Sequence, residues 1–227
     1  KSVISENFNG TERAVAVTGG FAFTAEEGSL EDGAIRIYDV SDPLKVRDLR
    51  TQKIYDASGI DFTDLVLMGD NYLIALTPLR AGGEDYDVTV LDRRDPNNLV
   101  NLKRIPIPQI DAFRGYAVGN TLYVAGRDGG VAVIDLTNVN APVVQVFNTQ
   151  GIARGVDVAG TLAVIADGST GLTFLDTTNL NNLTLAGSQN VGGTVWDVVL
   201  HRGSIYAANE QGIAYILNAA VPPMVDA

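Results

Sequence analysis

The chain contains no cysteine and a single histidine, His201, in 227 residues. Without cysteine the protein has no disulfide, no thiolate metal site and no cysteine nucleophile. A single histidine argues against histidine-rich metal sites and Ser-His-Asp chemistry. Because His201 falls in the turn His201-Arg202-Gly203, we expect a surface turn residue there rather than a general base.

Long apolar runs and helical periodicity are also missing. No window of about 18 apolar residues occurs, so we expect nothing in the sequence to span a membrane. No basic and apolar leader stands at the N-terminus, so no signal peptide is visible. Because the sequence begins at Lys1, we expect a processed or excised piece of a longer protein.

Positive charge is scarce. The chain has 16 Lys and Arg against 27 Asp and Glu, for a formal net charge of −11. An acidic excess repels a phosphate backbone, so we expect no nucleic-acid partner. With 46% hydrophobic residues, the chain can bury a substantial core in one domain.

What the sequence does contain is a unit that recurs every 41 to 53 residues. The marker is an aspartate at the end of the third strand in four units: Asp39, Asp92, Asp135 and Asp176. In the fifth unit Leu217 takes its place. Each unit shows short apolar alternations separated by glycine-containing turns, which predicts a four-stranded antiparallel meander.

The length of the repeated unit indicates the architecture. About 40 to 50 residues per four-stranded unit is typical of a propeller blade, whereas Leu-rich repeats recur every 20 to 29 or so. We therefore predict an all-β, five-bladed β-propeller that forms a single domain, residues 1–227. The blades are expected at 11–56, 57–110, 111–152, 153–192 and 193–221.

Closure of the ring is expected from the two ends of the chain. The proline-containing segment Val221-Pro222-Pro223 is a poor fourth strand, because proline cannot donate to a ladder. The short segment Ser2–Phe8 has no partner in its own unit. We expect it to supply the outer strand of the fifth blade, which leaves no long free edge.

A family resemblance rests on two runs that begin one or two residues after a glycine, Val131–Asn138 (VAVIDLTN) and Ile35–Pro43 (IRIYDVSDP). They resemble the LVIVD-type repeat of bacterial and archaeal propellers, and the resemblance covers nearly the whole chain. It implies a propeller often carried in large exported or surface proteins, with no common catalytic residues. We accordingly expect an extracellular or cell-surface location.

The repeated aspartates have a structural explanation. In Asp135-Leu-Thr-Asn138 and Asp176-Thr-Thr-Asn179, short polar side chains can bond nearby backbone N–H groups and fix the turn to the fourth strand. A catalytic or metal-binding role is the alternative, but one carboxylate per blade at the same turn cannot converge on one site. Glycine-rich segments 126–130 and 166–171 lie between strands, so we interpret them as hairpin turns rather than phosphate cradles.

Two sets of candidate site residues remain, both expected on the face where the inner strands begin. Aligning those strands on their turn glycines gives the first set: Arg13, Thr63, Arg114, Arg154 and Trp196. Arginine offers planar bidentate donors and tryptophan a stacking surface, which suits an anionic or carbohydrate ligand or a protein partner. The alternative is that each arginine pairs with a neighbouring carboxylate such as Glu12, Asp111 or Asp157.

The second set lies in two acidic loops: Glu26, Glu27, Glu31, Asp32, Glu84, Asp85 and Asp87. Calcium takes six to eight or so oxygen ligands, which flexible acidic loops can supply. The loops lack EF-hand spacing, and they can equally be solvated or contact a protein partner. We therefore expect no cofactor, with calcium as the alternative.

An enzymatic interpretation rests on carboxylates near the start of the inner strands. Glycoside hydrolysis needs two carboxylates roughly 5 to 9.5 Å apart, and the candidates are Asp64, Asp157 and Asp197, with Asp61 and Asp111 just before. Asp64 and Asp197 align with Gly155, and Asp157 lies two residues deeper. The blades lack long substrate-binding insertions. We therefore predict a monomeric, non-catalytic binding or protein-interaction module, with a glycosidase-like enzyme or a structural scaffold as alternatives.

Overall fold

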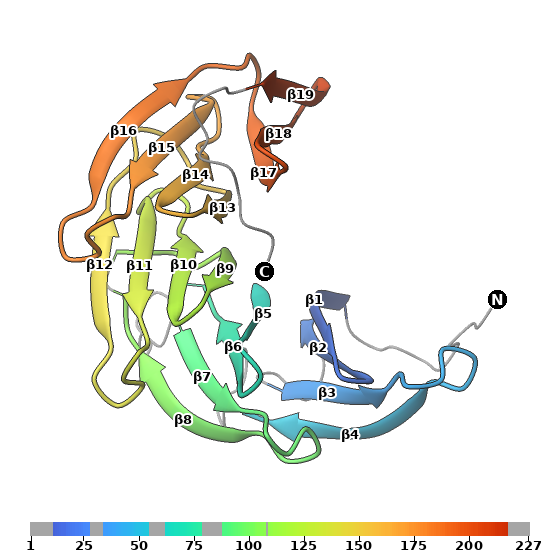
Figure 1. Cartoon of the computed structure of the whole chain (residues 1–227). Helices are drawn as coiled ribbons and strands as arrows, with labels where there is room; N and C mark the ends of the chain where they lie inside the picture. The colour runs from blue at the N-terminus through green and yellow to red at the C-terminus, as the bar shows by residue number, and fades with distance from the viewer. Residues whose placement is uncertain (1–10, 28–33, 55–61, 79–87, 108, 218–227) are drawn as a thin grey trace. The chain divides into compact units, whose positions relative to one another are not determined.

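The computed structural model describes residues 11–27, 34–54, 62–78, 88–107 and 109–217. These residues form nineteen β-strands and no helix. Every strand pairs only with its neighbours in the chain, and all the pairs are antiparallel (Figure 1). The predicted all-β architecture of repeated antiparallel meanders is therefore confirmed.

The chain divides into two compact units, and the first is Lys1–Pro106. It holds two four-stranded sheets. The first sheet comprises β1 (Thr11–Thr18), β2 (Phe21–Glu27), β3 (Ala34–Asp39) and β4 (Arg47–Lys53). The second comprises β5 (Asp64–Met68), β6 (Tyr72–Leu76), β7 (Val88–Asp92) and β8 (Val100–Ile105).

The second unit is Ile107–Ala227 and holds three sheets. The third sheet of the chain comprises β9 (Arg114–Val118), β10 (Thr121–Ala125), β11 (Val131–Asp135) and β12 (Val143–Phe147). The fourth comprises β13 (Gly155–Ala159), β14 (Leu162–Ala166), β15 (Leu172–Asp176) and β16 (Thr184–Gln189). The fifth has three described strands, β17 (Val195–His201), β18 (Ser204–Asn209) and β19 (Gly212–Leu217).

The expected closing strand, residues 2–8, lies outside the described residues, so its role stays a prediction. The fifth sheet accordingly shows three strands where the other four sheets show four. The single-domain assignment of residues 1–227 and its blade boundaries also stay predictions. Among the described residues, no helix is long and apolar enough to cross a membrane.

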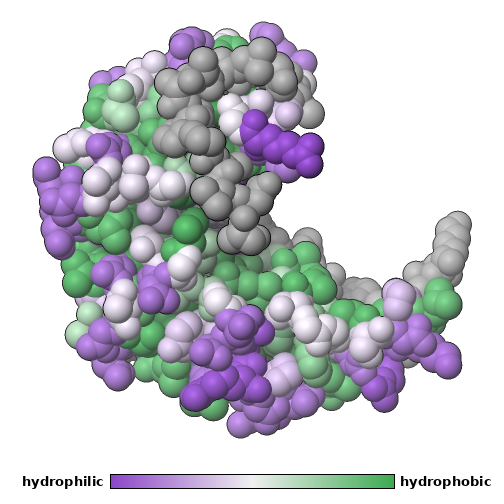
Figure 2. Space-filling model, in the orientation of Figure 1, coloured by the Kyte–Doolittle hydropathy of each residue, from purple (hydrophilic) through white to green (hydrophobic). Residues whose placement is uncertain are grey.

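The core lies between sheets, because the middle strands are apolar on both faces. In the second unit, Val133 of the third sheet and Ile165 of the fourth belong to one buried cluster. Val164 of the fourth sheet and Ile205 of the fifth belong to another. Burial of each such side chain contributes roughly 1.5–3 kcal/mol. Outer strands are more polar, and Figure 2 shows hydrophilic residues over β4.

The aspartate that ends the third strand fixes the following turn, as predicted. Its carboxylate accepts a hydrogen bond from the backbone N–H two residues on, at 2.8–3.0 Å, in Asp39, Asp92, Asp135 and Asp176. The polar residue three positions later repeats the arrangement at 3.0–3.1 Å: Asp42, Asp95, Asn138 and Asn179. Four successive sheets therefore share the same hydrogen-bonded turn between the third and the outer strand.

Consecutive sheets of the second unit are joined by backbone hydrogen bonds at equivalent places. Arg127, two residues past β10, exchanges N–H···O=C bonds of 2.9 and 3.0 Å with Ala153. Gly168, two residues past β14, accepts a 2.9 Å bond from the N–H of Val195. Both of these loops turn through positive φ, 48° at Arg127 and 66° at Gly168. These bonds hold the beginning of each inner strand against the preceding sheet.

Candidate binding site on the second unit

The beginnings of the inner strands β9, β13 and β17 bring together four of the polar side chains of interest. Arg114 opens β9, Arg154 immediately precedes β13, and Trp196 and Asp197 lie at the start of β17. An ion pair and a cation–π contact connect them. We call these four residues the Arg–Trp cluster.

The strand register changes one part of the sequence alignment. Arg114 pairs with Ala125, as Gly155 pairs with Ala166 and Asp197 with Ala208. Each of these three inner-strand residues stands four positions before the last residue of its strand. The expected alignment of Asp197 with Gly155 is confirmed, but Arg114 shares their position rather than that of Arg154 and Trp196.

Trp196 is displaced from the regular ladder. Val195 pairs with Asn209 and Asp197 with Ala208, so Trp196 is the additional residue of a β-bulge. A bulge redirects a side chain relative to the strand, and the indole is 50% exposed. The guanidinium carbon of Arg154 lies 4.2 Å from the indole centroid, which is cation–π geometry.

The Arg154 side chain has donor capacity that the described residues do not use. Its Nε is buried and has no hydrogen-bond partner among them. A buried N–H without an acceptor is costly, and a guanidinium has five donors in a fixed plane. Arg154 therefore carries an unsatisfied buried donor within the cluster.

Arg114 and Asp197 form an ion pair between the third and fifth sheets. Nη1 of Arg114 lies 3.4 Å from Oδ2 of Asp197, and Gly155 occupies the equivalent position in the fourth sheet between them. A Cβ atom on Gly155 would lie 2.5 Å from Oδ1 of Asp197. The two side chains are 50% and 40% exposed, so the ion pair contributes only about 0–1 kcal/mol to the stability of the fold. Its charges also remain accessible to a ligand.

Asp157, which lies close to Asp197 and Tyr116, is a buried carboxylate, 7% exposed. Its Oδ1 accepts a 2.7 Å hydrogen bond from the N–H of Val158, and its Oδ2 accepts one of 2.7 Å from Leu200 of the fifth sheet. Burial raises the pKa of Asp157, and the negative charge of the nearby Asp197 raises it further. The hydrogen bonds from these N–H groups and from the Tyr116 hydroxyl lower the pKa and offset part of the effect. Both oxygens thus accept backbone hydrogen bonds, Oδ1 within β13 and Oδ2 from the fifth sheet, which is a structural role.

Tyr116 and Arg127 were not anticipated. Burial raises the pKa of the Tyr116 phenol, as do the charge of Asp157 and its hydrogen bond to that carboxylate. The guanidinium of Arg127 lies 3.0 Å from the Asp111 carboxylate and 4.5 Å from the centroid of Phe113. Alternation along β9 could have identified Tyr116, which lies two residues from Arg114 and so on the same face.

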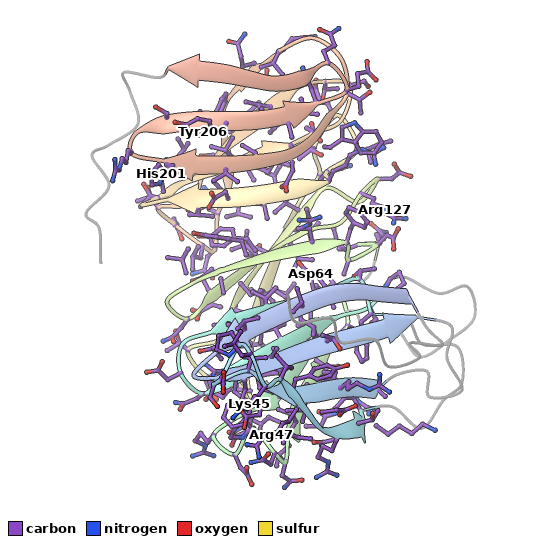
Figure 3. All side chains as sticks on the ribbon, turned by 90° about the vertical axis from the view of Figure 1, so that its right-hand side faces the viewer. Lys45, Arg47, Asp64, Arg127, His201 and Tyr206 are labelled. Carbon is purple, nitrogen blue, oxygen red and sulfur yellow. The ribbon has the colours of Figure 1, made fainter. Side chains whose placement is uncertain are left out.

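His201 lies away from this site. It ends β17 in an exposed turn, and Figure 3 shows it at the end of the second unit opposite Arg127. The prediction of a surface turn residue is therefore confirmed, and His201 is not available as a general base for the Arg–Trp cluster.

The other expected residues fall in the first unit. The Thr63 N–H donates to the carbonyl of Leu76 at 2.8 Å, and the Asp64 carboxylate accepts a 2.9 Å bond from Leu65. Arg13 is the additional residue of a bulge in β1, and its side chain lies outside the described part. The structure therefore describes three members of the first candidate set, Arg114, Arg154 and Trp196, as one site.

The side chains of the acidic-loop set lie outside the described residues. Glu26 and Glu27 end β2, but their side chains lie outside the described part. The remaining predicted calcium ligands, Glu31, Asp32, Glu84, Asp85 and Asp87, fall entirely outside it. Among the residues that are described, no group of three or more His, Cys, Asp or Glu is placed to hold a metal ion.

Comparison with known proteins supports the repeat and the fold. The family model described as LVIVD repeat matches residues 116–147 and 150–191, so the chain carries LVIVD repeats, as the sequence resemblance implied. No curated protein matches the sequence.

Two solved structures resemble the chain. A functionally unknown protein from Desulfotomaculum acetoxidans DSM 771 is similar with a TM-score of 0.68 and 12% identity, over 97% of this chain and 70% of that one. The RRP9 WD40 repeats are similar with a TM-score of 0.66 and 15% identity, over 96% of this chain and 63% of that one. At these identities the likeness concerns the fold, which is a β-propeller-like repeat.

Proposed function

We propose that the chain is a non-catalytic binding module and that the Arg–Trp cluster is its contact surface. The observation that carries the proposal is the half-exposed indole of Trp196 with the Arg154 guanidinium 4.2 Å from its centroid. A large aromatic ring left exposed on a bulge loses the benefit of burial. Such a ring, next to an arginine, is typical of a surface that a ligand or partner covers.

The charges of the cluster favour an anionic or sugar-like group on the ligand or on a protein partner. The Arg154 Nε lacks an acceptor, and a carboxylate can accept bidentate hydrogen bonds from a guanidinium. Half-exposed Asp197 can accept hydrogen bonds from hydroxyl groups in addition. A carboxylate-bearing sugar, or an acidic side chain presented by a partner protein, satisfies both kinds of group.

A glycosidase-like activity is disfavoured by the state of the two carboxylates. A retaining or inverting mechanism needs one carboxyl group to donate a proton and the second to attack or activate water. Asp157 is buried and accepts hydrogen bonds through both oxygens. Asp197 is paired with Arg114. Asp157 is therefore not presented to a substrate, and the accessible Asp197 lacks the second carboxyl group that hydrolysis requires.

The proposal includes a closed five-bladed propeller in which residues 2–8 form the outer strand of the fifth sheet. It is supported by the fifth sheet, which has three strands among the described residues where each of the other sheets has four, with β19 outermost. A paired β19 would leave no exposed ladder at this edge. We also retain an extracellular or cell-surface location as a proposal, on the basis of the family resemblance.

The test is a thermal-shift titration of the 227-residue chain with glucuronate, glucose, acetate and phosphate, because a ligand of the native state raises Tm. We expect glucuronate to raise Tm of the parent chain and to have a smaller effect on Arg154→Gln and Trp196→Ala. Arg202→Gln is the matched control, because it removes the same charge from an exposed turn at the other end of β17. An equal shift in Arg154→Gln and Arg202→Gln would place binding elsewhere.

A further inference from the structure

The outer strand β12 differs from the other outer strands in how its free edge is built. Outer strands expose unpaired N–H and C=O groups, and natural proteins protect them with bulges, charges or proline. Within the described residues β12 pairs with β11 and with no other strand. Its second edge is therefore open to another strand, as its position at the margin of its sheet in Figure 1 indicates.

Three of the four complete sheets carry a β-bulge in the outer strand at the same place. The additional residue is Leu49 in β4, Leu102 in β8 and Ala186 in β16. The ladder of β12 is regular along its whole length, from Val143 opposite Asp135 to Phe147 opposite Val131. Only β12 therefore lacks the bulge that twists an edge away from a partner.

Charge separates β12 from two of the three bulged strands. β4 contains four charged residues and β8 contains Lys103 and Arg104, whereas β12 reads Val-Val-Gln-Val-Phe. β16 has no charged residue either, but its ladder is interrupted by the bulge at Ala186. In fact no charged residue occurs between Leu136 and Ala153, in a chain whose net charge is −11. Val143 and Val146 are 44% and 47% exposed on this strand. β12 is thus a regular, uncharged, β-branched edge, the type that accepts a further strand.

We propose that β12 is a self-association edge, at which two copies of this chain pair their β12 strands in antiparallel fashion about Gln145. This register places Val143 opposite Phe147 and Val144 opposite Val146, so the strand is complementary to itself, as a two-fold interface requires. The choice of a second copy rests on that self-complementarity. It also rests on the neutral segment 136–153, where two acidic chains can approach without local repulsion.

The proposed association is weak, and the paired segment starts at Val143. Pro142 has no N–H to add to the ladder, and five residues per strand bury far less than the roughly 1,200–2,000 Å² of a stable interface. The sequence alone leads to the expectation of a monomer. The unprotected edge is evident only when the registers of the outer strands are compared.

The first test is sedimentation equilibrium of the 227-residue chain from about 10 µM to 1 mM, the range in which weak complexes form. We expect the weight-average mass to rise toward that of a dimer with concentration. Val146→Lys places a charge on the edge strand at an exposed position. It should raise the protein concentration at which half of the chains are dimeric at least about tenfold. Leu185→Lys is the matched control, because it adds the same charge at a 55% exposed position of the bulged strand β16. A parent chain that is monomeric throughout, or equal effects of the two variants, overturns the proposal.

A second test remains available if Val146→Lys fails to fold. The chain has no cysteine, so Gln145→Cys introduces a single thiol that the proposed register places opposite its counterpart. Directly opposed residues of antiparallel strands have Cα atoms about 4.5–5.5 Å apart, within reach of a disulfide. Mild oxidation should yield a disulfide-linked dimer several-fold faster than for Ser188→Cys on β16. Equal rates for the two variants also overturn the proposal.

Discussion

The absence of a side chain at Gly155 leaves the space that the carboxylate of Asp197 occupies. A Cβ atom at residue 155 would lie 2.5 Å from Oδ1 of Asp197, closer than two such atoms approach in proteins. Because Asp197 also pairs with Arg114, this one glycine connects the fourth sheet to the contact between the third and the fifth. The Arg–Trp cluster therefore depends on a residue that carries no functional group.

Gly155→Ala should displace Asp197 and lengthen its contact with Arg114. We expect a loss of about 0.5–3 kcal/mol in the free energy of unfolding, the range typical of local overpacking. Urea unfolding followed by circular dichroism measures it. Gly187→Ala is the control in the same sheet, because its Cβ would meet only Phe174, at 3.9 Å. An equal loss in the two variants would show that the contact with Asp197 does not matter.

Asp157→Asn should destabilise the second unit, because Asn has one acceptor oxygen where Asp157 receives N–H groups on both. The amide would face the N–H of either Val158 or Leu200, which leaves a buried donor unsatisfied and costs about 1–3 kcal/mol. Thermal and urea unfolding measure the loss. Asp128→Asn, in an exposed turn, is the control and should be nearly neutral.

The raised pKa of Asp157 also predicts a pH dependence. A carboxyl group whose pKa is higher in the folded state binds more protons there, so it makes stability fall as pH rises from the unfolded value near 3.8 through the folded pKa. Asp157→Asn removes this titration. The difference in unfolding free energy between parent and variant should therefore change between about pH 4 and neutral pH, and a constant difference would contradict a raised pKa.

For Asp39 we predict the opposite pH dependence of stability, at lower pH. Hydrogen bonds from Ser41 and then from Arg47 lower its pKa to about 2. Its stabilising contribution is complete above the unfolded pKa near 3.8 and is lost as pH falls through about 2. Asp39→Asn keeps a turn-forming side chain without the charge, so its Tm should approach that of the parent protein as pH is lowered from 5 or so toward 2. A constant difference in Tm between Asp39→Asn and the parent protein across this pH range would contradict a lowered pKa of Asp39.

The glycine before the third strand combines two constraints that can be separated. Gly171 has a φ of 100°, and a Cβ there would lie 2.3 Å from the carbonyl oxygen of Gln189. Gly160 has a φ of 60° with nothing within 4 Å of the added atom. We expect Gly160→Ala to cost about 1–2 kcal/mol from backbone strain alone, and Gly171→Ala to cost more in urea unfolding. A smaller loss for Gly171→Ala would mean that the backbone shifts freely to accept the new atom.

Some features of the site could be predicted from residues and some could not. The aspartates that fix the turn after the third strand were recognisable, because an Asp or Asn side chain bonds backbone only two residues away. Arg114 was misaligned by one position, although it stands five residues before Gly119 just as Gly155 stands five before Gly160. The bulge at Trp196, by contrast, is visible only in the strand register. Asp157 was a candidate acid until its bonds to Val158 and Leu200 showed a structural role.

The repeat, the antiparallel meander and the turns follow from the amino-acid sequence, because each depends on interactions between residues close in the chain. The contacts between sheets are evident only in the folded protein: Arg154 with Trp196, Arg114 with Asp197 next to Gly155, and Asp157 with the backbone of Leu200. These contacts join residues about 40 to 80 positions apart. They depend on the stacking of one sheet against the next, which no local pattern encodes.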